Sequence, residues 1–236
     1  TSPPPADPTL VYSAAQTILS AESPVIIAGN GVRVSRAFEQ LQELAELVAT
    51  PVATTAAGKG VFPEDHPLAL GVFGSFGQRV ANRTVAQADT ILIVGSKLAP
   101  SDTAGQNPQF LDPTRQHFIQ LDIEPKNAGW TFPCDHVVIG DAAVALSQLS
   151  DCIRDIGPPS DEVLDVQKAR LSNKREEYGF FDDAEFTSDQ IPLLPQRIVG
   201  EIRSGIDDDA IITCDAGENR LFMTHWFQNR KAGALV

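Results

Sequence analysis

The sequence predicts an α/β fold, a Rossmann-like parallel sheet with helices on both faces. Three observations support this prediction. Short apolar runs alternate with amphipathic segments of helical period between residues 8 and 156. The apolar runs are continuous, which is typical of strands buried on both faces. Glycine-containing turns separate many of these segments, as they do in strand–helix–strand units.

The first predicted unit occupies residues 9–55. Residues 9–20 predict a helix with one apolar face: Val11, Ala14, Ala15, Ile18 and Leu19. Pro24 then opens a short apolar run that predicts a buried strand followed by a glycine turn. Residues 35–49 have helical spacing, with Ser35 as the predicted N-cap. Residues 51–55 predict a second strand and complete a strand–helix–strand unit.

The same alternation continues to residue 156. Residues 71–77, GVFGSFG, predict a glycine-rich loop, and residues 78–87 predict a helix. Buried strands are predicted at 90–96, 117–123 and 136–140. A helix is predicted at 141–156, with Asp141 at its N-terminus and these side chains facing inward: Val144, Leu146, Leu149 and Ile153.

Beyond residue 156 the pattern breaks at GPPSDE and becomes charged, which predicts a helix and then a surface connector. Residues 193–202 predict a further helix with Leu194, Ile198 and Ile202 on one face, and residues 210–214 predict a strand. We therefore expect four segments: a linker at 1–8, a nucleotide-binding-like α/β domain at 9–156, a connector at 157–190, and the beginning of a second α/β unit at 191–236.

Composition excludes several classes of function. The 236-residue chain has a net charge of −13, which argues against nucleic acid as a partner because such binding needs a basic surface. No apolar run approaches the roughly 18 residues of a membrane span. The three cysteines are far apart and form no CxxC pair, which favours reduced thiols in a cytoplasmic protein over a metal knuckle.

Polar groups follow several of the predicted strands. Gly29 and Gly31 stand where a strand meets a helix, so their backbone amides can approach a phosphate. Lys97 follows a strand end and suits a phosphate, and Asp122 suits a ribose hydroxyl; Asp141 is placed similarly. The alternatives are a plain tight turn, helix caps and surface charges. An NAD-type clamp is poorly supported, because the third glycine of that fingerprint is missing.

No familiar catalytic or metal-binding set is present. The four histidines lack ligand spacing, and the sequence contains no P-loop or HExxH motif. We therefore assign no catalytic residue and no metal ligand to this chain.

Taken in order, several stretches resemble one family. The segments AESPVIIAGNGV, LAELVATPVATTAAGKGVFPEDHPLALGVFG, ADTILIVGSKL, HFIQLDIEP and VVIGDA are similar to the central domain of thiamine-diphosphate-dependent enzymes of the acetolactate synthase group. The resemblance covers residues 8–155. It implies a parent enzyme with an N-terminal pyrimidine-binding domain, this central domain, and a C-terminal diphosphate-binding domain.

The resemblance also implies an activity. The parent enzyme would use thiamine diphosphate and Mg²⁺ to decarboxylate a 2-oxo acid and form a new carbon–carbon bond, as a lyase or transferase, and would be a homodimer or homotetramer. Gly217, Glu218 and Asn219 match the loop that meets the cofactor diphosphate, although the family usually has glutamine and histidine at the last two positions. The family's catalytic glutamate lies in the N-terminal domain, and its GDG motif is not found here. We therefore expect the chain itself to be inactive.

Family members hold FAD, ADP or nothing in the central domain. Carried over by position, the nucleotide contacts are Gly29, Asn30, Gly31, Thr54, Thr55, Gly71, Val72, Gly95, Lys97, Asp122, Ile123 and Asp141. Lys97 and Ala99 replace an arginine and an aspartate of the FAD-binding members, which counts against FAD because lysine is a poorer phosphate clamp. The alternative is a stand-alone FAD- or ADP-binding module, or a structural module without catalysis. Residues 191–236 argue against a self-contained module.

Overall fold

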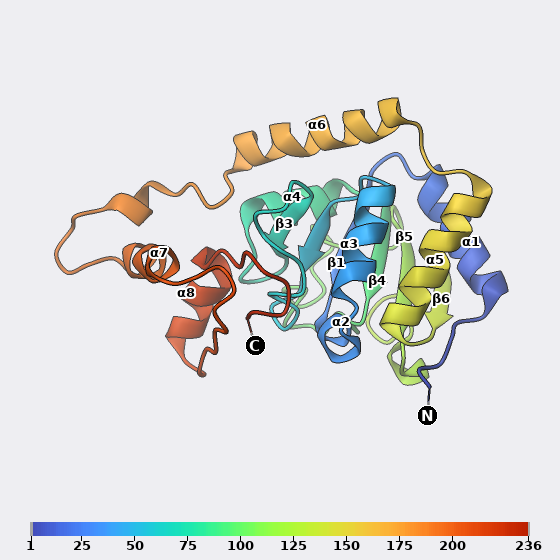
Figure 1. Cartoon of the computed structure of the whole chain (residues 1–236), viewed down its shortest axis with the longest axis horizontal. Helices are drawn as coiled ribbons and strands as arrows, with labels where there is room; N and C mark the ends of the chain where they lie inside the picture. The colour runs from blue at the N-terminus through green and yellow to red at the C-terminus, as the bar shows by residue number, and fades with distance from the viewer. Residues whose placement is uncertain (1, 236) are drawn as a thin grey trace.

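Six parallel strands form one sheet in the computed structural model, which describes residues 2–235. The strand order is β3-β2-β1-β4-β5-β6, the order of a doubly wound fold. The strands are β1 (Pro24–Ala28), β2 (Val52–Thr54), β3 (Ala69–Val72), β4 (Thr90–Val94), β5 (His117–Asp122) and β6 (His136–Ile139). Helices surround this sheet (Figure 1). The predicted fold class, a Rossmann-like parallel sheet with helices on both faces, is confirmed.

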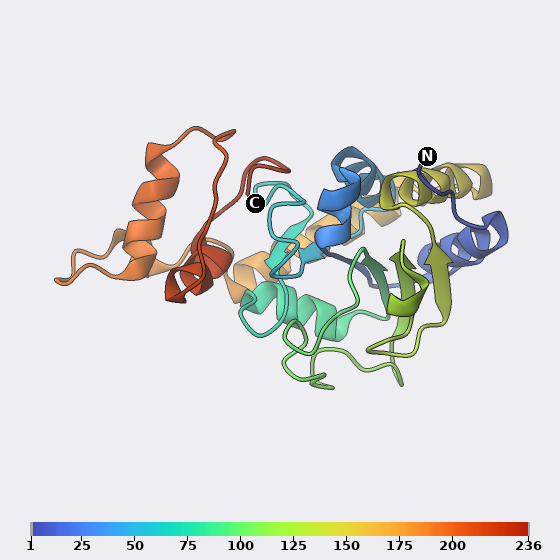
Figure 2. The ribbon, with the colours of Figure 1, turned by 90° about the horizontal axis from the view of Figure 1, so that it is seen from below.

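Two layers of helices cover the sheet (Figure 2). One layer is formed by α1 (Pro8–Ser20), α5 (Ala142–Ile156) and α3 (Phe38–Leu47), with α5 between the other two. On the other face lies α4 (Arg79–Gln87), which contacts α6 (Asp161–Tyr178). The short helices are α2 (Asn30–Ser35), η1 (Pro125–Asn127) and η2 (Ala184–Thr187). The last two helices, α7 (Pro195–Gly205) and α8 (Glu218–Trp226), pack on each other beside the sheet.

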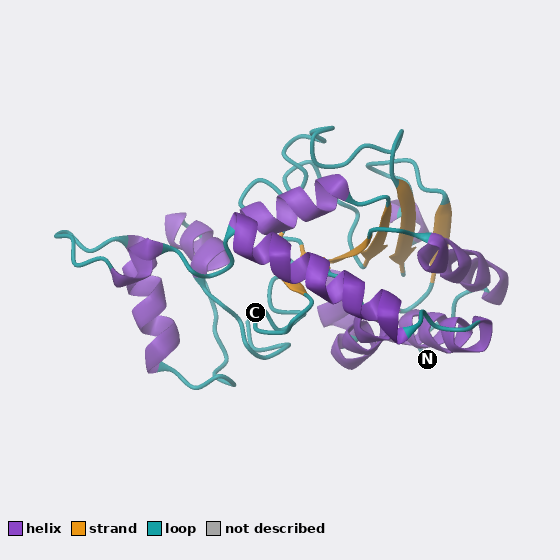
Figure 3. Cartoon of the chain, turned by 90° about the horizontal axis from the view of Figure 1, so that it is seen from above, coloured by secondary structure: helices purple, strands orange, loops and turns teal. Residues whose placement is uncertain are grey.

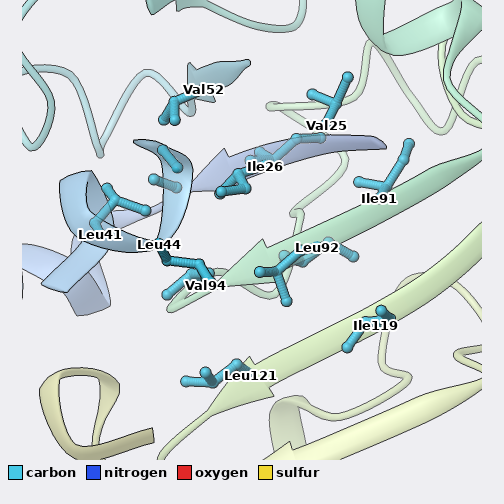
Figure 4. Close-up of a cluster of buried hydrophobic side chains, with 14 of the residues drawn as sticks. Val25, Ile26, Leu41, Leu44, Val52, Ile91, Leu92, Val94, Ile119 and Leu121 are labelled. Atoms are coloured by element: carbon cyan, nitrogen blue, oxygen red, sulfur yellow. The ribbon is translucent and has the colours of Figure 1, made fainter. Parts of the chain in front are cut away.

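The core lies between the central strands and the first helix layer (Figure 4). Every residue of β1 and β4 is buried, because helices cover both faces of these strands. Leu41 and Leu44 of α3 contribute fully buried side chains to this core. Phe118 in β5 is also fully buried, and its ring meets Phe132 edge to face at a centroid distance of 5.6 Å.

The charged helix α6 runs across the amino-terminal edge of the sheet (Figure 3). At one end, Arg170 donates to the Glu22 carbonyl and to Ser23 Oγ, at 2.9 and 2.7 Å. At the other end, Arg175 donates to the carbonyls of His66 (2.8 Å) and Ala69 (3.1 Å from Nε). The carboxyl-terminal edge of the sheet therefore remains free of this helix.

One predicted helix is wrong in its boundaries. The helix predicted at 35–49 is α3, which begins at Phe38, and residues 30–35 before it form α2. Arg36 between the two helices has a left-handed backbone with φ of 55°. Ser35 ends α2 instead of capping the next helix, and its hydroxyl donates to Asp141 Oδ1 at 2.8 Å. Ser35 thus bonds to Asp141, 106 positions further along the chain, and does not cap α3 as predicted.

Two other elements differ from the prediction. Residues 71 and 72 end the strand β3 instead of belonging wholly to a loop. The predicted strand at 210–214 forms a single bridge, between Ile212 and Leu235, and the Ile211 side chain is 76% exposed. One bridge does not make a ladder, so apolar sequence alone gave the wrong assignment there.

The ends of the described chain also differ from expectation. The carbonyl of Pro4 accepts from the Asp141 amide at 2.9 Å, and Ala6 is buried. The residues predicted as a linker are thus packed on the domain. On α7, Ile198 and Ile202 are exposed, whereas Val199 and Arg203 are the buried residues.

Candidate functional site

A cavity of about 460 Å³ opens at the carboxyl ends of the strands. It lies around β1 and β4, where the strand order changes direction, which is where ligands bind in open α/β sheets. Its volume falls within the roughly 300–1,000 Å³ of small-molecule sites. Eight of the residues predicted from the sequence line it: Asn30, Gly31, Thr55, Gly95, Lys97, Asp122, Ile123 and Asp141. We call this cavity the crevice.

The glycines of the crevice are required by backbone packing. A Cβ on Gly31 would lie 2.6 Å from Gly95 Cα, and a Cβ on Gly29 would lie 2.5 Å from the Gly95 carbonyl oxygen. Gly95 has a φ of +60°, which favours glycine. The loops after β1 and β4 therefore touch each other. This contact explains the three glycines whether or not a ligand is bound.

Both predicted acidic residues are held by hydrogen bonds through one oxygen. Asp122 Oδ1 accepts from the Glu124 amide (2.9 Å) and from Asn127 Nδ2 (3.1 Å). Asp141 is the N-cap of α5, as predicted, and its Oδ1 accepts from the first-turn amides of that helix. Among the described residues, the other oxygen of each carboxylate has no hydrogen-bond partner, so it is available to a hydroxyl group.

The crevice is predominantly acidic. Four carboxylates line it: Asp102, Asp122, Glu124 and Asp141. Burial raises the pKa of Asp102 above its usual value. Lys97 is the one cationic side chain among the described lining residues. Its ammonium nitrogen lies 4.8 Å from the ring centroid of Trp130, a cation–π contact beside the crevice.

Four of the predicted nucleotide contacts do not line the crevice. Gly29 is buried, and Thr54 is buried with a hydroxyl that lacks a partner among the described residues. Gly71 and Val72 belong to the edge strand β3 and are buried there. A Cβ on Gly71 would lie 1.9 Å from Gln78 Oε1, so this glycine makes room for a neighbouring side chain.

Gly217, Glu218 and Asn219 are placed apart from the crevice, at the start of α8. Gly217 is the N-cap residue with a φ of 141°, and all three residues are exposed. Asn219 lines a separate cavity of about 430 Å³ together with apolar side chains of α7 and α8. The structure therefore divides the predicted site residues between two places.

Some crevice residues were missed by the sequence analysis. Asn127 and Glu124 belong to the turn that orients Asp122, and Ser35 joins α2 to Asp141. The DIEPKN segment gave a signal for the first two, because an Asx turn before a proline is readable from sequence. Trp130 gave no periodic signal, since it lies in an irregular loop.

Three further observations concern the described residues as a whole. Within residues 2–235, no group of three or more His, Cys, Asp or Glu side chains is arranged to hold a metal ion. Over the same residues, no helix has the length and apolar character needed to cross a membrane. All three cysteines are free thiols.

Comparison with known proteins assigns the family. Residues 11–149 match the family model described as "Thiamine pyrophosphate enzyme, central domain". The "Probable acetolactate synthase large subunit" of Methanocaldococcus jannaschii is 33% identical, over 94% of this chain and 37% of that protein. The acetolactate synthase isozyme 3 large subunit of Escherichia coli is 27% identical, over 92% and 37%.

A relative with a differently named activity also matches. The sulfoacetaldehyde acetyltransferase of Alcaligenes xylosoxydans is 26% identical, over 88% of this chain and 38% of that protein. The chain thus spans less than two-fifths of the length of these curated relatives. The resemblance inferred from the sequence motifs is confirmed: the chain belongs to the acetolactate synthase-like family of thiamine-pyrophosphate-dependent enzymes, and residues 11–149 are its match to the central domain.

Proposed function

We propose that the enzyme to which this chain contributes decarboxylates a 2-oxo acid and forms a new carbon–carbon bond, as a lyase or transferase. The observation that carries this proposal is the family match together with the names of the relatives. Thiamine diphosphate stabilises the negative charge that loss of CO₂ leaves on carbon, and Mg²⁺ would bind its diphosphate. Because one relative is named an acetyltransferase, the identity of the 2-oxo acid is outside the proposal.

Within this enzyme we assign residues 9–156 to the central domain, 157–190 to a connector, and 191–236 to the beginning of the diphosphate-binding domain. Along the chain, α6 and η2 stand between the last strand of the sheet and the α7–α8 pair, which supports this division. We assign Gly217, Glu218 and Asn219 to the loop that meets the cofactor diphosphate. Their place at the start of the nine-residue helix α8 supports this role, because amide groups at a helix N-terminus favour an anion.

The activity is tested by measuring CO₂ release from a panel of 2-oxo acids, pyruvate among them, with thiamine diphosphate and Mg²⁺. We expect turnover by the whole enzyme and none by this chain alone, which lacks a GDG motif. Turnover by the chain alone would contradict the domain assignment. Light scattering on the whole enzyme tests the accompanying proposal of a homodimer or homotetramer.

For the crevice, we propose a nucleoside diphosphate as the ligand: ADP, or FAD bound through its ADP half. The convergence of eight predicted positions from five strand ends on one cavity supports this proposal. The free oxygen of Asp122 suits a ribose hydroxyl, and the exposed side chain of Ile123 suits the face of adenine. Asp141 contributes by fixing α5 and α2 at the mouth of the crevice.

The side chain at position 97 counts against FAD, because the FAD-binding members of the family have an arginine at this position. Lys97 is a point charge and does not bind a diphosphate in the bidentate manner of arginine. Four nearby carboxylates repel the diphosphate of the ligand, and the single charge of Lys97 must offset this repulsion. We therefore expect weak binding in which the ribose and base contribute as much as the diphosphate.

Isothermal titration calorimetry with ADP and FAD tests the crevice, and visible flavin absorbance of the purified protein distinguishes the two ligands. We expect Asp122→Ala to weaken ADP binding. The matched control is Asp151→Ala, which removes an exposed carboxylate on the outer face of α5. If neither nucleotide binds, the alternative of a structural module is favoured for this domain.

A further inference from the structure

A buried ion pair lies outside the crevice, between Lys59 and Glu64. Both side chains are 2% exposed, and Lys59 Nζ lies 2.6 and 2.8 Å from the two carboxylate oxygens. Burial lowers the pKa of Lys59 and raises the pKa of Glu64, so each charge alone is unfavourable here. Such a pair is weak evidence for a stabilising role, because apolar residues can often replace it. Its hydrogen bonds indicate a different use.

The second partner of the Glu64 carboxylate lies 165 positions further along the chain. Glu64 Oε2 accepts from the backbone amide of Asn229 at 2.7 Å, and the Glu64 amide donates to the Asn229 carbonyl at 2.6 Å. Asn229 is itself buried. The loop 57–64 therefore recognises the main chain of residues 227–235, which we call the strap.

Two further contacts extend this recognition along the strap. The Gly233 amide donates to the Gly60 carbonyl at 2.8 Å, and Arg33 donates to the Leu235 carbonyl at 3.1 Å. The same Arg33 guanidinium donates to the carbonyl of Ala57. The contact is close-packed: a Cβ on Gly60 would meet Leu235 Cβ at 2.8 Å.

The strap is connected to both ends of the loop at residues 213–217, covalently through α8 and by a hydrogen bond to Ile212. It begins at Phe227, the C-cap of α8, and α8 begins at Glu218. On the other side, the Ile212 amide donates to the Ala234 carbonyl at 2.8 Å. Residues 213–217 are thus bracketed by two attachments to one strap. Fixing the strap on the central domain fixes the start of α8 relative to the sheet.

We propose that Lys59 and Glu64 are positioning residues that place residues 217–219 by anchoring the strap. The Lys59 ammonium holds the Glu64 carboxylate, and the carboxylate accepts the Asn229 amide. An apolar pair would fill the same volume and would leave that amide without an acceptor. The anchor does not depend on the role of residues 217–219; its consequence for the cofactor rests on the function proposed above.

Hydrogen exchange measured by mass spectrometry tests the anchor on this chain. Glu64→Gln leaves Lys59 buried and unpaired, which is strongly destabilising, so two variants act from the strap side. Asn229→Pro removes the donated amide, and its control, Asn229→Ala, keeps it. Both variants lose the hydrogen bond from Asn229 Nδ2 to the Lys231 carbonyl, so they differ in the backbone amide. We expect peptides covering residues 210–219 to exchange faster in the proline variant than in the control. Exchange in the proline variant that is no faster than in the control overturns the inference and leaves the proposed function intact.

A second pair of variants approaches from the central domain. Gly60→Ala introduces the clash with Leu235 in a backbone with φ of +90°. Gly105→Ala carries the same kind of strain, at φ of +73°, with no atom within 4 Å of the added Cβ. We expect faster exchange of residues 210–219 in Gly60→Ala only. Equal exchange in the two variants would show that backbone strain, and not the strap contact, is responsible.

The consequence for the cofactor is measured separately, in the whole enzyme. We expect Asn229→Pro to weaken thiamine diphosphate binding by about fivefold or more, equivalent to about 1 kcal/mol, with ADP binding in the crevice unchanged. Faster exchange without a loss of thiamine diphosphate affinity would support the anchor. It would overturn the assignment of residues 217–219 to the cofactor.

Discussion

Replacing Asp141 by alanine removes three hydrogen bonds from one carboxylate oxygen. Oδ1 accepts from Ser35 Oγ at 2.8 Å and from the amides of Ala143 and Val144 at 3.0 and 3.3 Å. Loss of an N-cap side chain costs about 1 kcal/mol. Loss of the half-buried bond to Ser35 costs about 1 kcal/mol more. We expect the free energy of unfolding of Asp141→Ala to fall by about 2 kcal/mol.

Urea unfolding followed by circular dichroism measures this change, provided that the m-value stays constant. The matched variant is Asp141→Asn, because asparagine caps helices about as well as aspartate. It should lose less than half as much stability as the alanine variant. Equal losses in the two variants would refute the reasoning, since the negative charge and not the cap would then be responsible. We also expect Asp141→Asn to bind ADP at least as tightly as the unmodified chain does, because it keeps the cap and removes one of the four carboxylates that repel the diphosphate.

Three other substitutions have calculable outcomes. Burial raises the pKa of Asp102, so the folded state holds the carboxyl proton more tightly than the unfolded chain does. The free energy of unfolding therefore falls as the pH rises above 3.8, the usual pKa of this group. Asp102→Asn should raise the urea midpoint at neutral pH, and this gain should vanish below pH 3.8. Lys97→Ala should weaken ADP binding by about fivefold, the loss of about 1 kcal/mol for an exposed charge-assisted contact, and calorimetry showing no loss would remove Lys97 from the site. Phe118→Ala should cost about 3–5 kcal/mol because the ring is fully buried; a loss below 1 kcal/mol in urea unfolding would contradict the described core.

The sheet was predictable because its strands are short and uniformly apolar. The predicted ends of β4 and β5 lie within two residues of the observed ends. Parallel strands buried on both faces have continuous apolar sequences, which are easy to recognise. Asp141 was recognised as the start of a helix for a local reason, the N-cap preference. Local chemistry was thus sufficient wherever the decisive contact lies within a few residues along the chain.

The errors share a non-local origin. The break between α2 and α3 falls at Arg36, which has a left-handed backbone. This conformation is usual for glycine, so an arginine at this position gave no signal of a break. The close approach of Gly31 and Gly95, which requires glycine at both positions, was also not predicted. The anchoring of Asn229 by Glu64 joins residues 165 positions apart. Sequence patterns of helical or strand period carry no information about such pairs.

The contact of Arg175 with the edge strand has a consequence for solubility. β3 is the last strand on its side of the sheet, and an open strand edge is a template on which another chain can add a strand and begin aggregation. The Ala69 carbonyl is occupied by Arg175, and the Val72 carbonyl accepts from the Gln78 amide at 2.8 Å. The helix α6, which otherwise connects two parts of the chain, therefore also closes this edge against intermolecular strand pairing.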